Sequence, residues 1–131
     1  MTTKMNNLRV LICDDSILIR KKLRNTLEKC KCQEIFEAEN GNVAVESVKA
    51  NNPDLIFMDI VMPDKDGIEA LKEIMEIDPK AKVVMASSVG TSDHLKKALE
   101  NGAYDFIQKP ISLEAITNLI EKVLEEESAN V

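Results

Sequence analysis

The chain has 131 residues, a length typical of one compact domain. Its 17 Lys and Arg residues and 23 Asp and Glu residues give a net charge of −6, and 3% of its residues are aromatic. A negative chain repels phosphate backbones, and few rings are available for base stacking, so we expect no nucleic-acid partner. With 44% apolar residues, the chain can build a hydrophobic core.

The sequence shows no targeting signal and no disulfide framework, and this predicts a cytoplasmic protein without membrane insertion. No apolar run approaches the roughly 20 residues that span a bilayer, and the polar segment 1–7 lacks the apolar stretch of a secretory signal. Cys13, Cys30 and Cys32 are odd in number and lack the spacing of a disulfide framework or zinc site. Cys13 lies in an apolar run and is predicted to be a core residue.

Five short apolar runs alternate with longer amphipathic segments. The predicted strands are 8–13, 34–38, 55–58, 82–86 and 106–107. The four clearest helical stripes, each predicted to be a buried face, are Ile17, Leu18, Leu23 and Leu27; Val43, Ala44 and Val48; Ile68, Leu71, Ile74 and Met75; and Leu113, Ile116, Ile120, Val123 and Leu124.

The remaining helix, after Gly90, offers only Leu95, Ala98 and Leu99 to a core between residues 92 and 100. We therefore expect it to be the least firmly packed helix and the one most able to shift. The alternation of strand and helix predicts an α/β fold, a parallel sheet covered on both faces. Five such units use nearly the whole chain, which predicts a single domain.

Polar side chains directly follow four of the five predicted strands. They are Asp14, Asp15, Asp59, Ser87, Ser88 and Lys109. Parallel sheets of this kind bind ligands outside the carboxyl ends of their strands, so we expect these groups to converge at one edge.

Each of these residues also has a plain structural interpretation. Asp15 could cap the first helix, Asp59 could open a turn, Ser87 could belong to a loop, and Lys109 could be a solvated cation. These separate interpretations do not explain why the polar groups share one edge, so we favour a functional site.

Clustered carboxylates repel one another, and oxygen donors with water suit an octahedral Mg²⁺. A carboxylate beside that ion can attack a phosphoryl group and form an acyl phosphate, with Lys109 and a serine hydroxyl orienting the phosphoryl oxygens. The sequence has no Gly-rich phosphate loop, so we expect no nucleotide binding. His94 is the single histidine, which excludes a histidine-based metal cage.

The sequence resembles the receiver domain of two-component response regulators. The resemblance rests on Asp14-Asp15, the run MDIVMPDKDG at 58–67, Ser87 and the run FIQKP at 106–110. It extends from about Leu8 to the final helix, and the run MASSVG at 85–90 is most similar to the single-domain chemotaxis regulators of this family. It implies a flavodoxin-like, doubly wound sheet of five parallel strands in the order 2-1-3-4-5 with five helices. It also implies one receiver domain over 1–131, with a core of about 8–126, and no output domain.

The resemblance further implies a set of site residues. Asp59 would accept a phosphoryl group from a histidine of a sensor kinase. Asp15 and Asp59 would bind Mg²⁺ directly, Asp14 would bind it through water, and the Val61 carbonyl would complete the protein ligands. The chain would catalyse only its own phosphorylation and dephosphorylation and would not otherwise be an enzyme.

Switch residues are implied as well. Ser87 would contact the phosphoryl group, Phe106 would occupy the space that Ser87 leaves, and the Lys109–Pro110 bond would be cis, which is rare elsewhere. The loosely packed fourth helix would then move and alter a surface that it forms with the fifth strand and the fifth helix. The expected exposed members of this surface include Lys97, Tyr104 and Lys122.

Two departures from the family pattern bear on the site. Ile111 replaces an aromatic residue common in the family, and aliphatic Val61 and Val89 flank the expected path of the hydrolytic water.

The expected downstream partner of this monomer is a protein target such as a flagellar motor switch. Alternatives are a phosphorelay intermediary that passes its phosphate to a histidine phosphotransfer protein, a Mg²⁺-dependent phosphatase with an aspartate nucleophile, and a binding domain with a degenerate site. Val61 argues against the phosphatase, because such hydrolases carry a second Asp there.

Overall fold

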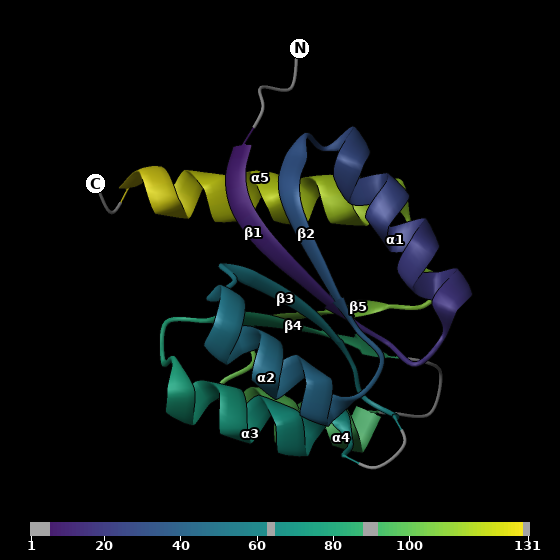
Figure 1. The fold of residues 1–131 in the computed structure, drawn as a ribbon, viewed down its shortest axis with the longest axis vertical. Helices are drawn as coiled ribbons and strands as arrows, with labels where there is room; N and C mark the ends of the chain where they lie inside the picture. The colour runs from purple at the N-terminus through teal and green to yellow at the C-terminus, as the bar shows by residue number, and fades with distance from the viewer. Residues whose placement is uncertain (1–5, 63–64, 88–91, 130–131) are drawn as a thin grey trace.

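The computed structural model describes residues 6–62, 65–87 and 92–129. Five parallel strands form one sheet in the order β2-β1-β3-β4-β5, and five helices alternate with them (Figure 1), which confirms the predicted fold. The strands are β1 (Asn6–Cys13), β2 (Cys32–Ala38), β3 (Leu55–Asp59), β4 (Lys82–Ser87) and β5 (Asp105–Gln108). The helices are α1 (Ile17–Lys29), α2 (Gly41–Asn51), α3 (Gly67–Ile77), α4 (Ser92–Glu100) and α5 (Leu113–Ala129).

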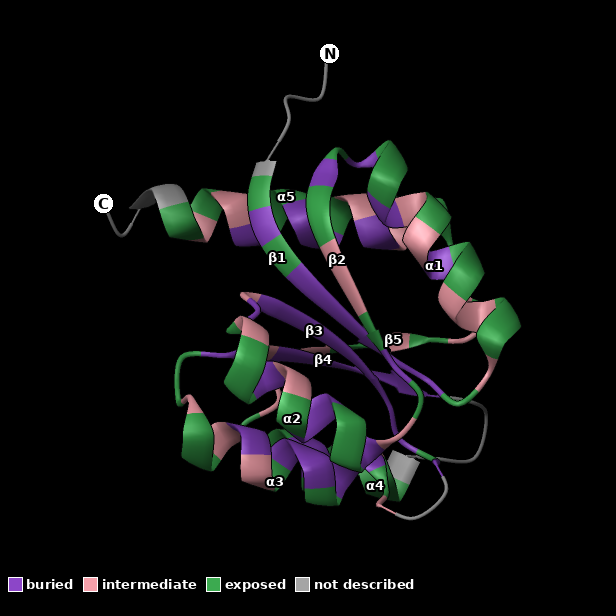
Figure 2. Ribbon diagram, viewed as in Figure 1, coloured by how far each residue is buried: buried purple, intermediate pink, exposed green. Residues whose placement is uncertain are grey.

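Both faces of the sheet are covered: α1 and α5 lie on one face, and α2, α3 and α4 lie on the other (Figure 1). Successive side chains of a strand point to opposite faces, so Val10 and Ile12 enter the core under α1 and α5 while Leu11 and Cys13 enter the other core. The strands β3 and β4 are buried along almost their whole length (Figure 2). This double burial explains the unbroken apolar runs of the sequence.

Side-chain caps fix where three helices begin at the carboxyl edge of the sheet. The Ser16 hydroxyl accepts a hydrogen bond from the Ile19 amide at the start of α1, and Asn40 and Asp66 cap α2 and α3 in the same way. A cap satisfies one of the otherwise unpaired amides of a first helical turn. The three loops at this edge are therefore held at their helical ends.

Three of the four predicted buried stripes are wrong at their N-terminal members. Ile17 and Leu18 are 74% and 62% exposed, because the buried side of α1 follows Leu23 and Leu27. At 3.6 residues per turn, Ile17 and Leu18 lie about 120° and about 140° around the helix from Leu23. Val43, which is 40% exposed, deviates from the buried side of α2 for the same reason.

Leu113 and Leu99 are also exposed rather than buried, and Met75 and Leu124 are partly buried. Leu113 occupies the first turn of α5, at the edge of the core. In α4, Ala98 is the one fully buried side chain among those described, which agrees with the expected weak packing of this helix. Cys13 is a core residue as predicted, and Cys30 and Cys32 are buried as well.

Strand boundaries differ slightly from the predicted ones. Asp59 and Ser87 are the last residues of β3 and β4 rather than the first residues after them. The strand backbone therefore fixes the direction of both side chains and positions them more firmly than a loop would.

Among the described residues, none of the helices combines the length and the apolar character that a membrane crossing requires.

At Gly67, α3 approaches the end of β3 closely. A Cβ atom at this position would lie 2.2 Å from the Asp59 carbonyl oxygen, and the Gly67 amide donates to the Ile60 carbonyl oxygen at 2.8 Å. No side chain fits there without moving the backbone that carries Asp59.

We expect Gly67→Ala to lower the free energy of unfolding by about 1–3 kcal/mol, because the new methyl group overpacks a site bounded by backbone. Urea denaturation followed by circular dichroism measures this loss. Lys72→Ala, at an exposed position of the same helix, is the control and should change stability by less than about 0.5 kcal/mol. Equal stability of the two variants would contradict the close approach.

Candidate functional site

Three carboxylates converge at the carboxyl edge of the sheet, as the sequence predicts. Asp14 and Asp15 follow β1, and Asp59 ends the adjacent strand β3. One carboxylate oxygen from each lies within 4.8 Å of one from each of the others. Asp14 and Asp59 are buried and Asp15 is exposed, so the cluster opens to solvent on one side.

Asp14 is held at four of its atoms. Its amide donates to the Ala38 carbonyl oxygen at the end of β2, and its Oδ1 accepts from the Ser16 amide at 2.9 Å. Its Oδ2 accepts from Lys109 Nζ at 3.0 Å, and its carbonyl oxygen accepts from Arg20 Nη1 at 2.5 Å. The position of this buried carboxylate is therefore fixed from both backbone and side chain.

Lys109 directly follows β5, the edge strand that β3 and β4 separate from β1, and connects this strand to the cluster. Its ammonium also lies 3.2 Å from Asp59 Oδ2, so one cation bridges two carboxylates. Burial by itself favours the neutral amine, but the hydrogen bond to Asp14 and the negative charges of both partners outweigh it and raise the pKa of Lys109. The Lys109 side chain is 18% exposed and pairs with two carboxylates, so its plain interpretation as a solvated cation is wrong.

Asp59 is the electrostatically stressed member of the cluster. Burial and the neighbouring Asp14 charge raise the pKa of Asp59, although Lys109 and a hydrogen bond from the Val61 amide act in the opposite direction. Three carboxylates and one ammonium leave two negative charges at the cluster. A divalent cation would neutralise this charge, and oxygen donors at this spacing suit Mg²⁺.

The two predicted switch residues lie on the neighbouring strands β4 and β5. Ser87 is 3% exposed, and its hydroxyl donates to the Ile107 carbonyl oxygen at 3.5 Å, the outer limit of a hydrogen bond. Phe106 is 46% exposed on β5. Ser88, Val89 and Gly90 lie outside the described residues. The Lys109–Pro110 peptide bond is cis, as predicted.

Of the three residues predicted to be exposed on the α4, β5 and α5 surface, Lys97 and Lys122 are exposed and Tyr104 is half-buried. The Tyr104 hydroxyl donates to Glu126 at 2.7 Å, and Lys122 Nζ lies 4.8 Å from the ring centre. These contacts with α5 cover the ring, which the sequence pattern alone does not indicate.

Cys13 lies directly beneath the cluster. Its thiol donates to the Asn40 carbonyl oxygen at 3.4 Å and contacts Met62. Burial, together with the charges of Asp14 and Asp59, raises the pKa of Cys13 to about 12. The thiol is therefore neutral and acts as part of the core.

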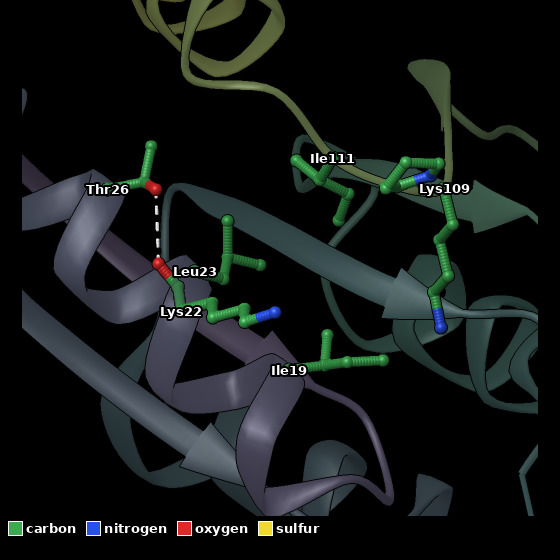
Figure 3. A pocket seen from close by; sticks show the side chains of 7 residues that line it. Ile19, Lys22, Leu23, Thr26, Lys109 and Ile111 are labelled. Carbon is green, nitrogen blue, oxygen red and sulfur yellow. Dashed lines mark hydrogen bonds between the residues drawn. The ribbon is translucent and has the colours of Figure 1, made fainter.

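A groove of about 640 Å³ lies beside the cluster, between α1 and the segment after β5. Figure 3 shows Ile19 and Leu23 on one side of it and Ile111 and Lys109 on the other. Ile111, at the position where an aromatic residue was the family expectation, packs against the core under α1 and α5. The groove borders the acidic site through Lys109.

Arg20 is the site neighbour that sequence reasoning missed. It stands six residues after Asp14 on α1 and bonds the Asp14 backbone, and its other partner, Glu37, comes from β2. A cation on a helix surface gives no sequence signal of such a contact, because the contact depends on the rotation of α1 and on its position beside β2.

The comparisons with known proteins agree with this geometry. The family model of the response regulator receiver domain matches residues 10–121. This chain belongs to the response regulator receiver family. It is 43% identical over 116 residues to the chemotaxis protein CheY of Bacillus subtilis, covering 88% of this chain and 97% of that protein. The corresponding CheY of Thermotoga maritima is 42% identical over 115 residues, covering 88% and 96%.

Among solved structures, the receiver domain of NtrX from Brucella abortus is 31% identical with a TM-score of 0.82. The match covers 88% of this chain and 98% of that domain. Receiver domains of this kind are signalling components of two-component systems, and the CheY relatives link this receiver to chemotaxis. Receiver domains generally bind Mg²⁺ at an acidic pocket, and the cluster of three aspartates offers such a donor set.

We expect Asp59→Asn to be more stable than the wild-type receiver at pH 7 in the presence of a chelator. The raised pKa of Asp59 means that the folded protein holds a proton more tightly than the unfolded chain, so ionisation disfavours folding. The advantage of the variant should therefore be full above the folded pKa and should shrink as the pH falls toward the ordinary value of 3.8. Urea denaturation between pH 4 and pH 7 measures it.

Glu125→Gln is the matched control, because it removes one negative charge from an exposed position of α5. If both substitutions change stability equally at every pH, the strain at Asp59 is absent and only net charge matters.

Proposed function

We propose that this receiver domain is a phosphorylation-dependent switch in chemotaxis and that Asp59 is its phosphoacceptor. The observation that carries the proposal is the Asp59 carboxylate, which is buried, ends a strand, pairs with the Lys109 ammonium and lies close to the carboxylates of the other two aspartates. Such a carboxylate is held in one orientation with its charge only partly compensated. The names of the CheY relatives support the pathway.

The proposed reaction is transfer of a phosphoryl group from a phosphohistidine of a sensor kinase. An Asp59 oxygen attacks phosphorus, the new O–P bond forms, the N–P bond breaks, and the imidazole leaves with the electron pair of that bond. Lys109 remains protonated and stabilises the phosphoryl oxygens. No proton needs to be removed from the nucleophile, because the carboxylate is ionised when it attacks.

The proposed Mg²⁺ ligands are Asp15 and Asp59 directly, Asp14 through water, and the Val61 carbonyl. When bound, the cation neutralises the carboxylates and the incoming phosphoryl oxygens. Asp14 keeps its hydrogen bonds to Lys109 and Ser16, which suits a ligand that acts through water. Asp15 is exposed and accessible to the ion.

The proposed response begins at Ser87. Phosphorylation adds charge near −2 and new acceptor oxygens at Asp59, which attract the weakly held Ser87 hydroxyl. Phe106 then occupies the vacated space, and α4 shifts with the adjoining surface of β5 and α5. We propose that this surface recognises a downstream protein, such as a flagellar motor switch, and that the receiver works as a cytoplasmic monomer.

We expect the protein to acquire one labile phosphoryl adduct when it is incubated with Mg²⁺ and acetyl phosphate, as detected by mass spectrometry of the intact chain. Asp59→Ala should abolish the adduct, and so should a chelator. Asp93→Asn, which removes an exposed carboxylate of α4, is the control and should keep the adduct. An adduct that survives in Asp59→Ala would overturn the assignment of the phosphoacceptor.

We also expect beryllium fluoride with Mg²⁺, a mimic of the phosphoryl group, to change amide hydrogen exchange in α4 and β5. Ser87→Ala should reduce this change by at least about half, because the hydroxyl that couples the site to β5 is missing. Exchange in α2 serves as the internal reference. Identical exchange of α4 and β5 with and without the mimic would contradict the proposed coupling.

A further inference from the structure

Arg20 contacts the acidic cluster through the backbone of Asp14 rather than through a carboxylate. Its Nη1 donates to the Asp14 carbonyl oxygen at 2.5 Å, while its Nε donates to Glu37 Oε1 on β2 at 3.1 Å. The Arg20 side chain is 12% exposed, and its bond to the Asp14 carbonyl oxygen is partly buried, whereas Glu37 is 33% exposed. One planar guanidinium therefore ties the end of β1, the first turns of α1 and β2 together.

The bonded carbonyl belongs to the peptide unit that joins Asp14 to Asp15. A peptide unit is planar, so a hydrogen bond to its carbonyl oxygen fixes the plane and with it the direction in which the Asp15 backbone continues. Asp14 has further anchors at its amide and its carboxylate, whereas Asp15 is the exposed member of the cluster. The Arg20 bond thus acts on the link between the fixed carboxylate and the exposed one.

Arg24, one helical turn later, offers a natural comparison. Its Nε donates to the other oxygen of Glu37 at 2.7 Å, and its Nη2 donates to the Ile35 carbonyl oxygen at 3.0 Å. Each arginine therefore makes one bond to Glu37 and one to a backbone carbonyl. They differ in which carbonyl they hold: Arg24 holds the middle of β2, and Arg20 holds the loop of the cluster.

We propose that Arg20 is a positioning residue of the cation site, which places the Asp15 carboxylate by fixing the Asp14–Asp15 peptide. The inference rests on the proposed Mg²⁺ site. A purely electrostatic role predicts the opposite sign, because an arginine beside a cation site repels the cation. Removal of the charge would then strengthen Mg²⁺ binding, whereas loss of positioning weakens it.

The test compares Arg20→Met with Arg24→Met by nuclear magnetic resonance titration with MgCl₂ alone. Methionine keeps most of the aliphatic stem and removes the same charge and the same two kinds of hydrogen bond in each case. We expect Arg20→Met to weaken the Kd for Mg²⁺ about tenfold, as outer-shell partners of metal ligands typically do. Arg24→Met should change it less than about twofold, even where its stability falls.

Arg20→Lys provides a second, milder variant in case Arg20→Met does not fold. One ammonium cannot reproduce the two-directional donation of the guanidinium, so the Kd should lie between those of wild type and Arg20→Met. A metal-free readout accompanies the titration: the carbonyl ¹³C chemical shift of Asp14 should change in both Arg20 variants, because its oxygen loses the guanidinium hydrogen bond, and should stay unchanged in Arg24→Met.

Unchanged or tighter Mg²⁺ binding by the Arg20 variants would overturn the positioning role and leave the proposed function intact. So would an equal weakening in the Arg20 and Arg24 variants, because that outcome reflects general destabilisation. Failure of the wild-type protein to bind Mg²⁺ would overturn both the proposed site and this inference.

Discussion

The repulsion among carboxylates gathered at one end of a buried sheet is the constraint on which the rest of this structure depends. Asp14 follows β1 and Asp59 ends the adjacent strand β3, and both side chains are buried, so water cannot screen them fully. Lys109 bridges them from β5 and removes one unit of the excess charge. The remainder stays uncompensated by the described side chains, and this excess makes the edge a site for a divalent cation and for phosphoryl chemistry.

The repulsion does not separate these carboxylates, because the strands that carry them are packed between the two cores. Both cores contain side chains with no exposed surface, and Gly67 brings α3 into direct contact with the backbone of Asp59. Energy gained by burial in the two cores is many times larger than the local cost of one strained carboxylate. Functional sites commonly store local strain that the rest of the protein supports, and here the support comes from the central strands β1 and β3.

The α/β class and the convergence of the site could be predicted from the pattern of apolar runs, whereas the strand order 2-1-3-4-5 was implied by the family resemblance. Apolar runs define the strands, and a parallel sheet brings their carboxyl ends to one edge, so Asp14, Asp59 and Lys109 meet wherever the intervening helices lie. Helix rotation is a weaker signal: Ile17 and Leu18 are apolar yet face outward, and Arg20 is charged yet largely covered. Such contacts depend on how an entire helix is oriented against its neighbours, which no local pattern specifies.

The two sides of the site are held with unequal firmness, and this asymmetry affects how a receiver converts a new charge into a conformational change. On the β1 side, Asp14 is bonded at four atoms and the arginines of α1 share Glu37 with β2. On the β4 side, the Ser87 hydroxyl makes a bond at the outer distance limit, Phe106 is half-exposed, and α4 buries one described side chain fully. A phosphoryl charge added between the two sides displaces the groups whose movement requires the least free energy. The firm side then serves as the fixed frame, and the displacement is directed toward α4 and β5.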